Sequence, residues 1–283
     1  MQNLTVLGTG VLGSQIIFQA AYSGKNVVAY DISDEILEKL PERWEHLKPY
    51  YLSDLPDATP EKLDAAVSRI RASSDLADAV KDADIVIEAV PERLDIKQQT
   101  WEKVSAVAPE KTIFCTNSST LLPSQIASFT DRPAKFLATH FANQVWKFNT
   151  CEIMGHPGTD PQVFEAAAEF AEQIGMVAIR IHKEQPGYVL NSLLVPFLGA
   201  AAKLLVRDVA SIEDVDRVWR ISTGSPMGPF QIYDIVGMMT PYMLNKDSDD
   251  PEMKQFADYI KTEYIDKGYL GRAAGRGFYD YSK

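Results

Sequence analysis

The sequence predicts an α/β protein whose N-terminal part is a doubly wound sheet and whose C-terminal part is an all-α domain. Two observations predict this division. Up to Ile181, short apolar runs alternate with segments of helical spacing. From Pro186 onward the apolar segments have helical spacing, and the first of them, 188–206, is long and carries few charges. We therefore expect two domains, 1–184 and 185–283.

The strongest local pattern lies at the start of the chain. A short apolar strand at 4–7 is followed at once by a glycine turn, Gly8-Thr-Gly10-Val-Leu-Gly13. A helix at 11–22 and a second strand at 26–30 come next, and Asp31 follows that strand. This order of strand, glycine turn, helix, strand and acid is typical of a Rossmann dinucleotide-binding unit.

Each glycine of the turn has its own task. Gly8 permits the tight turn, Gly10 leaves room for a pyrophosphate, and Gly13 lets the helix pack close to the sheet. The backbone N–H groups of the first helical turn, which includes Val11 and Leu12, would then bind the phosphates with help from the helix dipole.

Asp31 favours NAD over NADP, because a carboxylate accepts hydrogen bonds from ribose hydroxyls but repels a 2′-phosphate. The residues after it, Ile32 and Ser33, supply no arginine to hold such a phosphate. Two alternatives remain: a glycine turn that binds nothing, or a site for FAD. One short chain with a single fingerprint leaves little room for a flavin domain.

Composition limits the range of partners. The net charge of −11 and the pI near 4.9 argue against binding to nucleic acid or to an anionic membrane. The only cysteines, Cys115 and Cys151, form no disulfide framework and no zinc set. No apolar run reaches the roughly 20 residues of a membrane span, and the first strand begins too close to Met1 for a secretory leader. We expect a cytoplasmic enzyme with a small-molecule substrate.

The other expected elements follow in chain order. In the first domain they are helix 34–47, a proline-bearing break at 48–60, helix 61–70, short helix 73–81, strand 83–89, helix 94–107, strand 112–115, helix 123–129, strands 135–139 and 148–154, helix 160–174 and strand 176–181. In the second they are helices 188–206 and 212–222, a turn at 224–229, and helical segments to 267.

Three loops at the carboxyl ends of predicted strands carry polar residues: 89–92, 116–120 and 140–143. Ligands of doubly wound sheets bind at this edge, so we expect the site there, in a cleft that faces the helical domain. His140 is the best candidate for acid–base chemistry, because imidazole titrates near neutral pH. The alternative is a buried, hydrogen-bonded histidine. The other three histidines, at 46, 156 and 182, are interpreted as surface or structural.

The segment from Thr139 to Val145, continued by Cys151-Glu152-Ile, resembles the signature around the catalytic histidine of the L-3-hydroxyacyl-CoA dehydrogenases. Six other blocks also match this family, in its order. They are Gly8–Gly13 with Asp31, Glu88–Glu92 with Lys97, Asn117–Ser119, Pro186–Asn191, Pro226–Phe230 and Gly275–Tyr279.

The resemblance implies roles for single residues. His140 would remove the proton of a 3-hydroxyl group while a hydride passes to the nicotinamide, and Glu152 would pair with His140 and orient its ring. Ser119 and Asn191 would bind oxygens of the substrate. Cofactor-contacting positions of the family fall on Ala89, Glu92, Lys97, Asn117, Ser119 and Asn143. Read without the family, Glu152 is an ordinary strand-end acid, Ser119 a turn residue and Asn191 a helix cap.

The chain also departs from the family where a lysine-rich helix binds the CoA nucleotide. Here residues 42–54 contain one lysine, Lys48, so a CoA phosphate would find little positive charge. The alternative is a shifted helix that uses Arg43 and Lys48 and binds CoA more weakly. The resemblance therefore supports a short-chain 3-hydroxyacyl-CoA substrate, whereas this surface favours a free 3-hydroxy acid. A protein that binds NAD without catalysis is a third alternative. The family also implies a homodimer formed through the helical domain.

Overall fold

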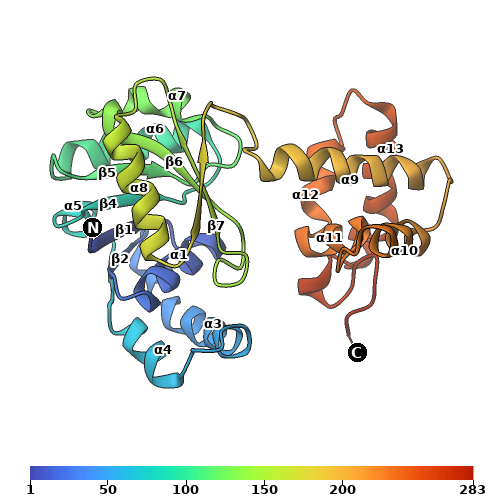
Figure 1. The fold of residues 1–283 in the computed structure, drawn as a ribbon, viewed down its shortest axis with the longest axis horizontal. Helices are drawn as coiled ribbons and strands as arrows, with labels where there is room; N and C mark the ends of the chain where they lie inside the picture. Colours follow the sequence, from blue (N-terminus) through green and yellow to red (C-terminus); the bar gives the residue numbers. More distant parts are fainter. Residues whose placement is uncertain (283) are drawn as a thin grey trace. The chain divides into compact units, whose positions relative to one another are not determined.

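The computed structural model describes residues 1–282. They form two compact units, Met1–Val189 and Leu190–Lys283, each of which is described by itself (Figure 1). The structural division falls a few residues beyond the expected boundary at 184/185, because Tyr188 packs with Ala138 and Met154 of the first unit. The functional limits of the two domains stay a prediction.

The first unit is built on one eight-stranded sheet, in the order β3-β2-β1-β4-β5-β6-β7-β8. The strands are β1 (Asn3–Leu7), β2 (Asn26–Tyr30), β3 (Ile70–Ser73), β4 (Ile85–Glu88), β5 (Ile113–Thr116), β6 (Phe136–Phe141), β7 (Thr150–Gly155) and β8 (Val177–Ile181). Neighbouring strands are parallel except for β6 and β7, which are antiparallel. The order of β1 to β6 is that of a Rossmann fold, which confirms the predicted fold class.

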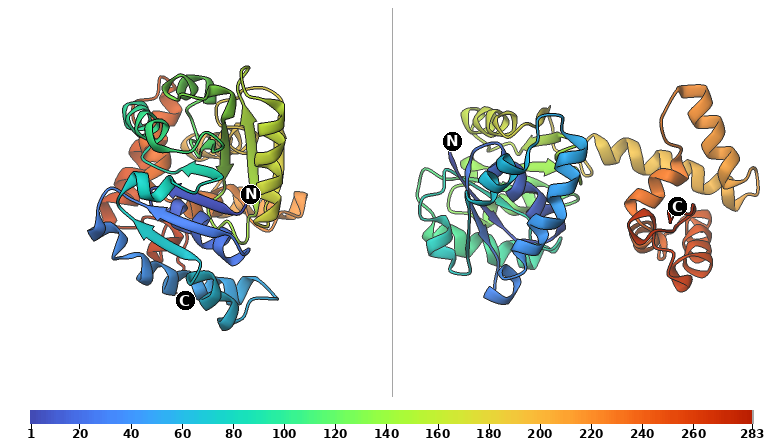
Figure 2. Two further views of the ribbon diagram at one scale, coloured as in Figure 1. Left: turned by 90° about the vertical axis from the view of Figure 1, so that its left-hand side faces the viewer. Right: turned by 90° about the horizontal axis from the view of Figure 1, so that it is seen from below.

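Helices cover both faces of this sheet (Figure 2). One face packs against α1 (Val11–Tyr22) and α8 (Pro161–Gln173), and α3 (Leu40–Asp54) and α4 (Pro60–Val67) pack in turn against α1. The other face packs against α5 (Leu76–Val80), α6 (Leu94–Val107) and α7 (Pro123–Ile126). Successive strand residues therefore belong to different cores: Ile85 and Ile87 lie in the first core and Val86 in the second.

The structure corrects three expectations for residues 34–81. The helix expected at 34–47 is two helices, α2 (Asp34–Leu37) and α3, and α3 continues through Pro49 to Asp54 where a break was expected. Proline normally ends a helix, but here the spacing of Trp44, Leu47 and Tyr51 continues a buried stripe across it.

The second and third corrections concern the segment after α3. The helix expected at 61–70 ends at Val67, and residues 70–73 form the edge strand β3, which the sequence did not reveal because it is short and only partly buried. The helix expected at 73–81 is the shorter α5, which is capped by the Asp75 side chain.

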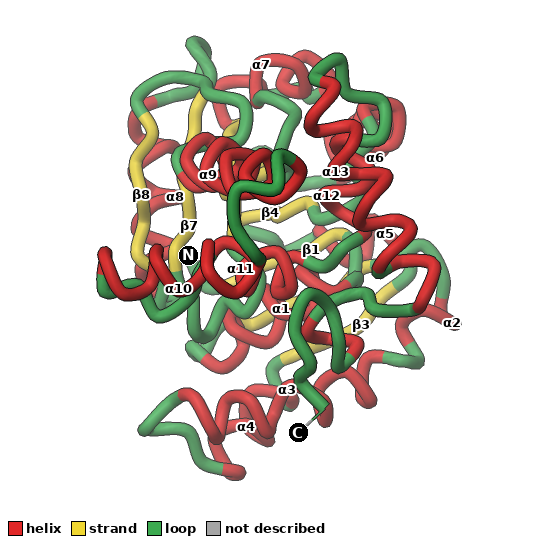
Figure 3. Tube along the Cα trace, turned by 90° about the vertical axis from the view of Figure 1, so that its right-hand side faces the viewer, coloured by secondary structure: helices red, strands yellow, loops and turns green. Residues whose placement is uncertain are grey.

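The second unit consists of helices, as predicted (Figure 3). They are α9 (Leu190–Val206), α10 (Ile212–Thr223), α11 (Pro229–Val236), α12 (Met239–Asn245) and α13 (Pro251–Glu263). Their core includes Phe230 and Phe256. The C-terminal segment is fastened to α11 by buried Asp234, whose carboxylate accepts hydrogen bonds from the backbone N–H of Phe278 (2.7 Å) and the hydroxyl of Tyr281 (2.9 Å). Across residues 1–282, no helix has the length and apolar character needed to span a bilayer.

Both cysteines are free and fully buried in the core of the first unit. Cys115 lies on β5 and Cys151 on β7. Burial in apolar surroundings raises the pKa of both thiols well above the usual range.

Candidate active site

His140 and Glu152 face each other across the antiparallel strands β6 and β7. Twelve residues separate them in sequence, yet they are direct partners in the strand register. His140 Nδ1 lies 2.9 Å from Glu152 Oε2, and both side chains are buried. The hydrogen-bond pattern assigns the Nδ1 proton to the contact with the carboxylate, so Nε2 is the ring atom that can take or give a proton. His140 was expected in the loop after this strand, but it lies within β6 itself.

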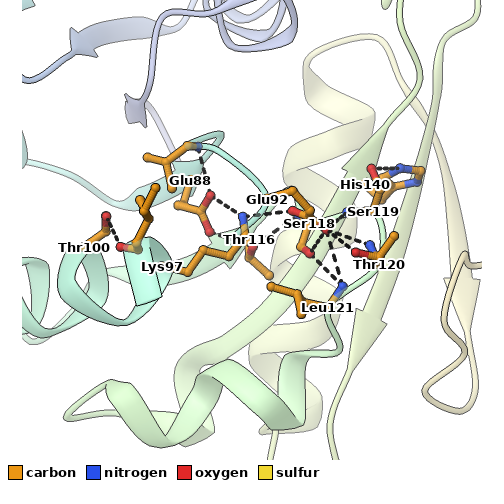
Figure 4. Close-up of polar contacts among 12 residues, drawn as sticks. Glu88, Glu92, Lys97, Thr100, Thr116, Ser118, Ser119, Thr120, Leu121 and His140 are labelled. Atoms are coloured by element: carbon orange, nitrogen blue, oxygen red, sulfur yellow. Dashed lines mark hydrogen bonds and ion pairs between the residues drawn. The ribbon is translucent and has the colours of Figure 1, made fainter. Parts of the chain in front are cut away.

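Ser119 stands on the other side of the imidazole. Its Oγ is 3.2 Å from His140 Nε2, and it belongs to the loop that follows β5 (Figure 4). The structure thus brings together three of the four residues expected to act on substrate, since Glu152, His140 and Ser119 form one hydrogen-bonded series. Asn191, the fourth, is the second residue of α9 in the other unit.

The loop of Ser119 wraps around the carboxylate of Glu92. Glu92 Oε1 accepts hydrogen bonds from Ser118 Oγ (2.5 Å), from the N–H of Ser119 (3.0 Å) and from the N–H and hydroxyl of Thr120 (2.8 and 2.9 Å) (Figure 4). Partial burial would raise the pKa of Glu92, but these bonds and the charge of Lys97 lower it to about 2. Glu92 is therefore ionised at neutral pH, and it holds the loop as an anion in a nest of donors.

Lys97 is buried between two carboxylates. Its Nζ lies 2.7 Å from Glu88 Oε1 and 3.3 Å from Glu92 Oε2, and its side chain is 1% exposed. Glu88 is fully buried at the end of β4 and also accepts a hydrogen bond from Thr116 Oγ1 (2.8 Å). These contacts join the carboxyl ends of β4 and β5 to the start of α6. The ammonium group of Lys97 thus pairs with carboxylates of its own chain, and its expected contact with the cofactor stays a prediction.

The glycine turn has the shape that a dinucleotide requires. A Cβ on Gly13 would lie 2.0 Å from the carbonyl oxygen of Gly8, so the helix approaches the strand with backbone against backbone. Gly8 has φ +97°, and a Cβ there would lie 2.7 Å from the carbonyl oxygen of Ala89. A Cβ on Gly10 would meet nothing within 4 Å. The surface over the first turn of α1 is therefore open, and this turn has no side-chain cap.

Asp31 follows β2, where the ribose-binding acid is expected. Its Oδ2 accepts hydrogen bonds from the N–H (2.8 Å) and hydroxyl (2.7 Å) of Thr9, and its Oδ1 accepts one from the N–H of Ile32 (2.9 Å). The glycine turn thereby holds the carboxylate in a fixed orientation. These residues fit NAD: an uncovered helix start for the phosphates and an oriented acid for the ribose.

Two further candidates for cofactor contacts lie in different surroundings. Asn117 is buried next to β5, and its Oδ1 accepts a hydrogen bond from the N–H of Phe141 (3.0 Å), which links the ends of β5 and β6. Asn143 is exposed in the loop after β6. The contacts of Asn117 and Asn143 with a cofactor stay predictions.

Comparison with known proteins identifies the family. Residues 3–185 match the model of the 3-hydroxyacyl-CoA dehydrogenase NAD-binding domain, and residues 187–281 match that of the 3-hydroxyacyl-CoA dehydrogenase C-terminal domain. The chain belongs to the 3-hydroxyacyl-CoA dehydrogenase family. It is therefore an oxidoreductase, and its cofactor is NAD.

Members of the family align along the whole chain. The mitochondrial hydroxyacyl-coenzyme A dehydrogenase of Rattus norvegicus is 33% identical over 288 residues, which cover 99% of this chain and 91% of that protein. A probable 3-hydroxybutyryl-CoA dehydrogenase of Bacillus subtilis is 30% identical and covers 100% and 98%. Among solved structures, a diketoreductase that acts on dicarbonyl compounds is 54% identical, with a TM-score of 0.95 and 99% of both chains covered.

Tyr188 contacts His140, although the sequence indicated no role for it. Tyr188 lies in the matched block Pro186–Asn191, but no role was assigned to it. In the structure its ring stacks on His140, with ring centroids 4.4 Å apart and planes 12° apart. The sequence carried one signal, an aromatic residue directly after Pro-Gly at the end of the sheet domain.

We expect Gly10→Ala to weaken NADH binding at least about 10-fold while it changes stability by less than about 1 kcal/mol, because its Cβ meets open space where a pyrophosphate would approach. Gly13→Ala is the matched control: its Cβ overlaps the Gly8 carbonyl, so the variant should lose about 1–3 kcal/mol of stability or more. NADH fluorescence titration and thermal unfolding measure the two effects. Wild-type NADH affinity in Gly10→Ala would contradict the assignment of this turn.

We expect Lys97→Met to destabilise the protein by about 3–5 kcal/mol, because it leaves the buried Glu88 carboxylate without its cation. Lys111→Met is the control, since Lys111 pairs with Asp84 at an exposed site and should cost less than about 1 kcal/mol. Urea unfolding compares the two variants. The double variant Glu88→Gln/Lys97→Met should regain part of the lost stability. If Lys97→Met and Lys111→Met lower the free energy of unfolding equally, the buried ion pair does not have this stabilising role.

Proposed function

We propose that this protein interconverts a 3-hydroxy carbonyl compound and the corresponding 1,3-dicarbonyl compound, with His140 as the acid–base group. The observation that carries the proposal is the buried series Glu152–His140–Ser119 at the carboxyl edge of the sheet. A 3-hydroxyacyl group and its 3-keto product are one such pair.

In oxidation, His140 Nε2 takes the proton of the 3-hydroxyl group, and in reduction it returns that proton to the new alkoxide. Glu152 compensates the positive charge that the ring gains, since its Oε2 lies 2.9 Å from Nδ1. Ser119 Oγ lies next to Nε2, so its hydroxyl can donate to the same substrate oxygen as charge develops on it. Bound NAD supplies the hydride exchange. Asn191 is proposed to bind a second oxygen of the substrate.

The residues proposed to hold the cofactor are Gly8, Gly10, Val11, Leu12, Gly13, Asp31, Ala89, Glu92, Lys97, Asn117, Ser119 and Asn143. The buried position of Lys97 supports an indirect part for it. Through its two ion pairs, it would hold the side chains of Glu88 and Glu92 in place beside the glycine turn.

A free dicarbonyl compound is the substrate class that the surface of α3 supports best. Lys48 is the only lysine of this helix, and its Nζ is held by Glu45 (2.6 Å) and Asp64 (2.8 Å). At the end of the helix, Asp54 accepts hydrogen bonds from Trp146 Nε1 and Lys147 Nζ. This surface offers little positive charge to a CoA nucleotide. The 54% identity to a diketoreductase favours the same class.

A short-chain L-3-hydroxyacyl-CoA is the second candidate substrate. It is favoured by the family models and by relatives named 3-hydroxybutyryl-CoA dehydrogenase, which align over almost their whole length. The cytoplasmic location expected from the sequence stays a prediction.

We also propose that the protein is a homodimer joined through its helical unit. Large apolar side chains of this unit are more than half exposed: Leu193 on α9, Val218 and Ile221 on α10, and Met243 and Leu244 on α12. Exposed apolar surface of this extent is typical of an association surface.

Sedimentation equilibrium should give twice the chain mass, and Ile221→Glu should lower the association constant. A monomer at micromolar concentration would contradict the proposal.

We expect His140→Ala to lower kcat by about 10²–10⁴-fold, the usual contribution of a positioned acid–base group. NADH oxidation in the presence of a 1,3-dicarbonyl compound measures this effect. His156→Ala is the control, because His156 lies in the loop after β7 with its Nε2 against the Pro133 carbonyl, and this variant should keep wild-type turnover. Undiminished kcat in His140→Ala would show that the acid–base group is elsewhere.

We expect kcat/KM for free 1,3-dicarbonyl compounds to exceed that for acetoacetyl-CoA, because α3 lacks an unpaired lysine for the CoA phosphates. Initial rates with NADH and acetoacetyl-CoA, acetoacetate or ethyl acetoacetate test this order. The neutral ester shows whether a carboxylate is needed. A higher kcat/KM for the CoA ester would establish the second candidate in place of the first.

A further inference from the structure

Tyr188 has an unusual backbone for a buried aromatic residue. Its φ is +54°, in the left-handed region that side chains other than those of Gly, Asn and Asp rarely adopt, and the preceding Gly187 has φ +79°. Tyr188 is only 1% exposed. Strain of this kind persists where surrounding contacts hold it, and it is often found at functional sites. The contacts of Tyr188 therefore decide what it does.

The ring of Tyr188 covers the imidazole of His140. The two rings are nearly parallel, with centroids 4.4 Å apart. Nδ1 of His140 faces Glu152 and Nε2 faces Ser119, so both hydrogen bonds depend on the plane of the imidazole. A stacked neighbour opposes tilting of that plane and preserves both contacts.

The hydroxyl of Tyr188 holds the loop of Ser119. It donates a hydrogen bond to the carbonyl oxygen of Ser118 at 2.7 Å. The same loop is held by Glu92 through the N–H of Ser119 and the hydroxyl of Ser118. Burial raises the pKa of the Tyr188 hydroxyl well above its usual value, so it remains a donor at working pH. Tyr188 and Glu92 thus fix Ser118 through different atoms.

The residue after Tyr188 completes the arrangement. The N–H of Val189 donates to Glu152 Oε1 at 2.8 Å, while Oε2 of the same carboxylate faces His140. The left-handed turn at Tyr188 therefore allows one dipeptide to contact the imidazole, the serine loop and the glutamate. Filling the core with Ala138 and Met154 would need only an apolar ring and not the hydroxyl.

We propose that Tyr188 is a positioning residue for the acid–base series: its ring sets the plane of His140, and its hydroxyl places Ser119 through the Ser118 carbonyl. The inference rests on the proposed function in that it takes His140 as the acid–base group. Tyr188 acts through these residues.

Two substitutions separate the ring from the hydroxyl. Tyr188→Phe keeps the stacking and removes one hydrogen bond, so kcat should fall about 3–10-fold. Tyr188→Leu removes both, so kcat should fall at least about 30-fold, as misplaced catalytic groups do. NADH affinity should stay within about twofold in both. Tyr51→Phe is the control, because Tyr51 is equally buried and its hydroxyl donates to Gln19 (2.8 Å) away from the series, so its kcat should stay within about twofold.

A spectroscopic readout tests the placement of His140 without relying on turnover. The chain has four histidines, so labelling histidine with ¹⁵N gives few signals, and the signal lost in His140→Ala identifies His140. Wild type and Tyr188→Phe should share the pattern of a ring protonated at Nδ1. In Tyr188→Leu, His140 should show a mixture of tautomers, because its imidazole is no longer held in one plane by a stacked ring.

Three outcomes would overturn the inference. The first is wild-type kcat and an unchanged ¹⁵N pattern in Tyr188→Leu. The second is an equal loss of kcat, NADH affinity and thermal stability, which indicates only a structural part. The third, decisive if Tyr188→Leu does not fold, is kcat within twofold of wild type in Tyr188→Phe. Full turnover in His140→Ala would refute the proposed function itself, whereas an inactive His140→Ala with neutral Tyr188 variants would refute only the role of Tyr188.

Discussion

The antiparallel pairing of β6 with β7 is the constraint on which the site depends. In an otherwise parallel sheet, this one reversal brings Glu152 back beside His140 at the carboxyl edge. Because side chains alternate along a strand, the same register sends Cys151 and Ile153 into the core and leaves His140 and Glu152 on the opposite face. A shift of one residue in this register would separate the pair and expose core side chains.

Charged side chains have different roles at the glycine turn and at the neighbouring ends of β4 and β5. Around the glycine turn, the groups proposed to bind the cofactor are backbone N–H groups and one oriented acid. Next to it, Glu88, Lys97 and Glu92 form a compact series of charges that holds the ends of β4 and β5 and the loop of Ser119. The buried ammonium group of Lys97 thus stabilises the strand ends and, through Glu92, the loop of Ser119. A rigid loop would keep Ser119 close to His140.

Local patterns were enough to predict much of the architecture. The glycine turn, Asp31 and the helix at 11–22 are contiguous, and their spacing alone indicates a dinucleotide site. The all-α second domain followed from helical spacing in 188–206 and 212–222. Its position at a strand end and its imidazole had already indicated His140, and the family resemblance added Glu152 and Ser119. The structure brings these three residues together, although their chemical roles stay proposals.

Features set by tertiary contacts were not predictable in the same way. Pro49 indicates a helix end, but α3 continues to Asp54 because Trp44 and Tyr51 on either side of the proline pack in the core. β3 is a short edge strand whose sequence, Ile-Arg-Ala-Ser, has no clear alternation. Nothing in the sequence shows that Tyr188 adopts a positive φ, because this conformation is imposed by contacts with residues far away along the chain.

The burial of the two cysteines has a chemical consequence. Thiolate, not thiol, reacts with oxidants and alkylating reagents, and the raised pKa values keep both sulfur atoms protonated at neutral pH. Reagents also have no route to side chains with no exposed surface. The native enzyme therefore exposes no reactive thiol, and loss of activity to thiol-specific reagents would report unfolding, not modification of the folded protein.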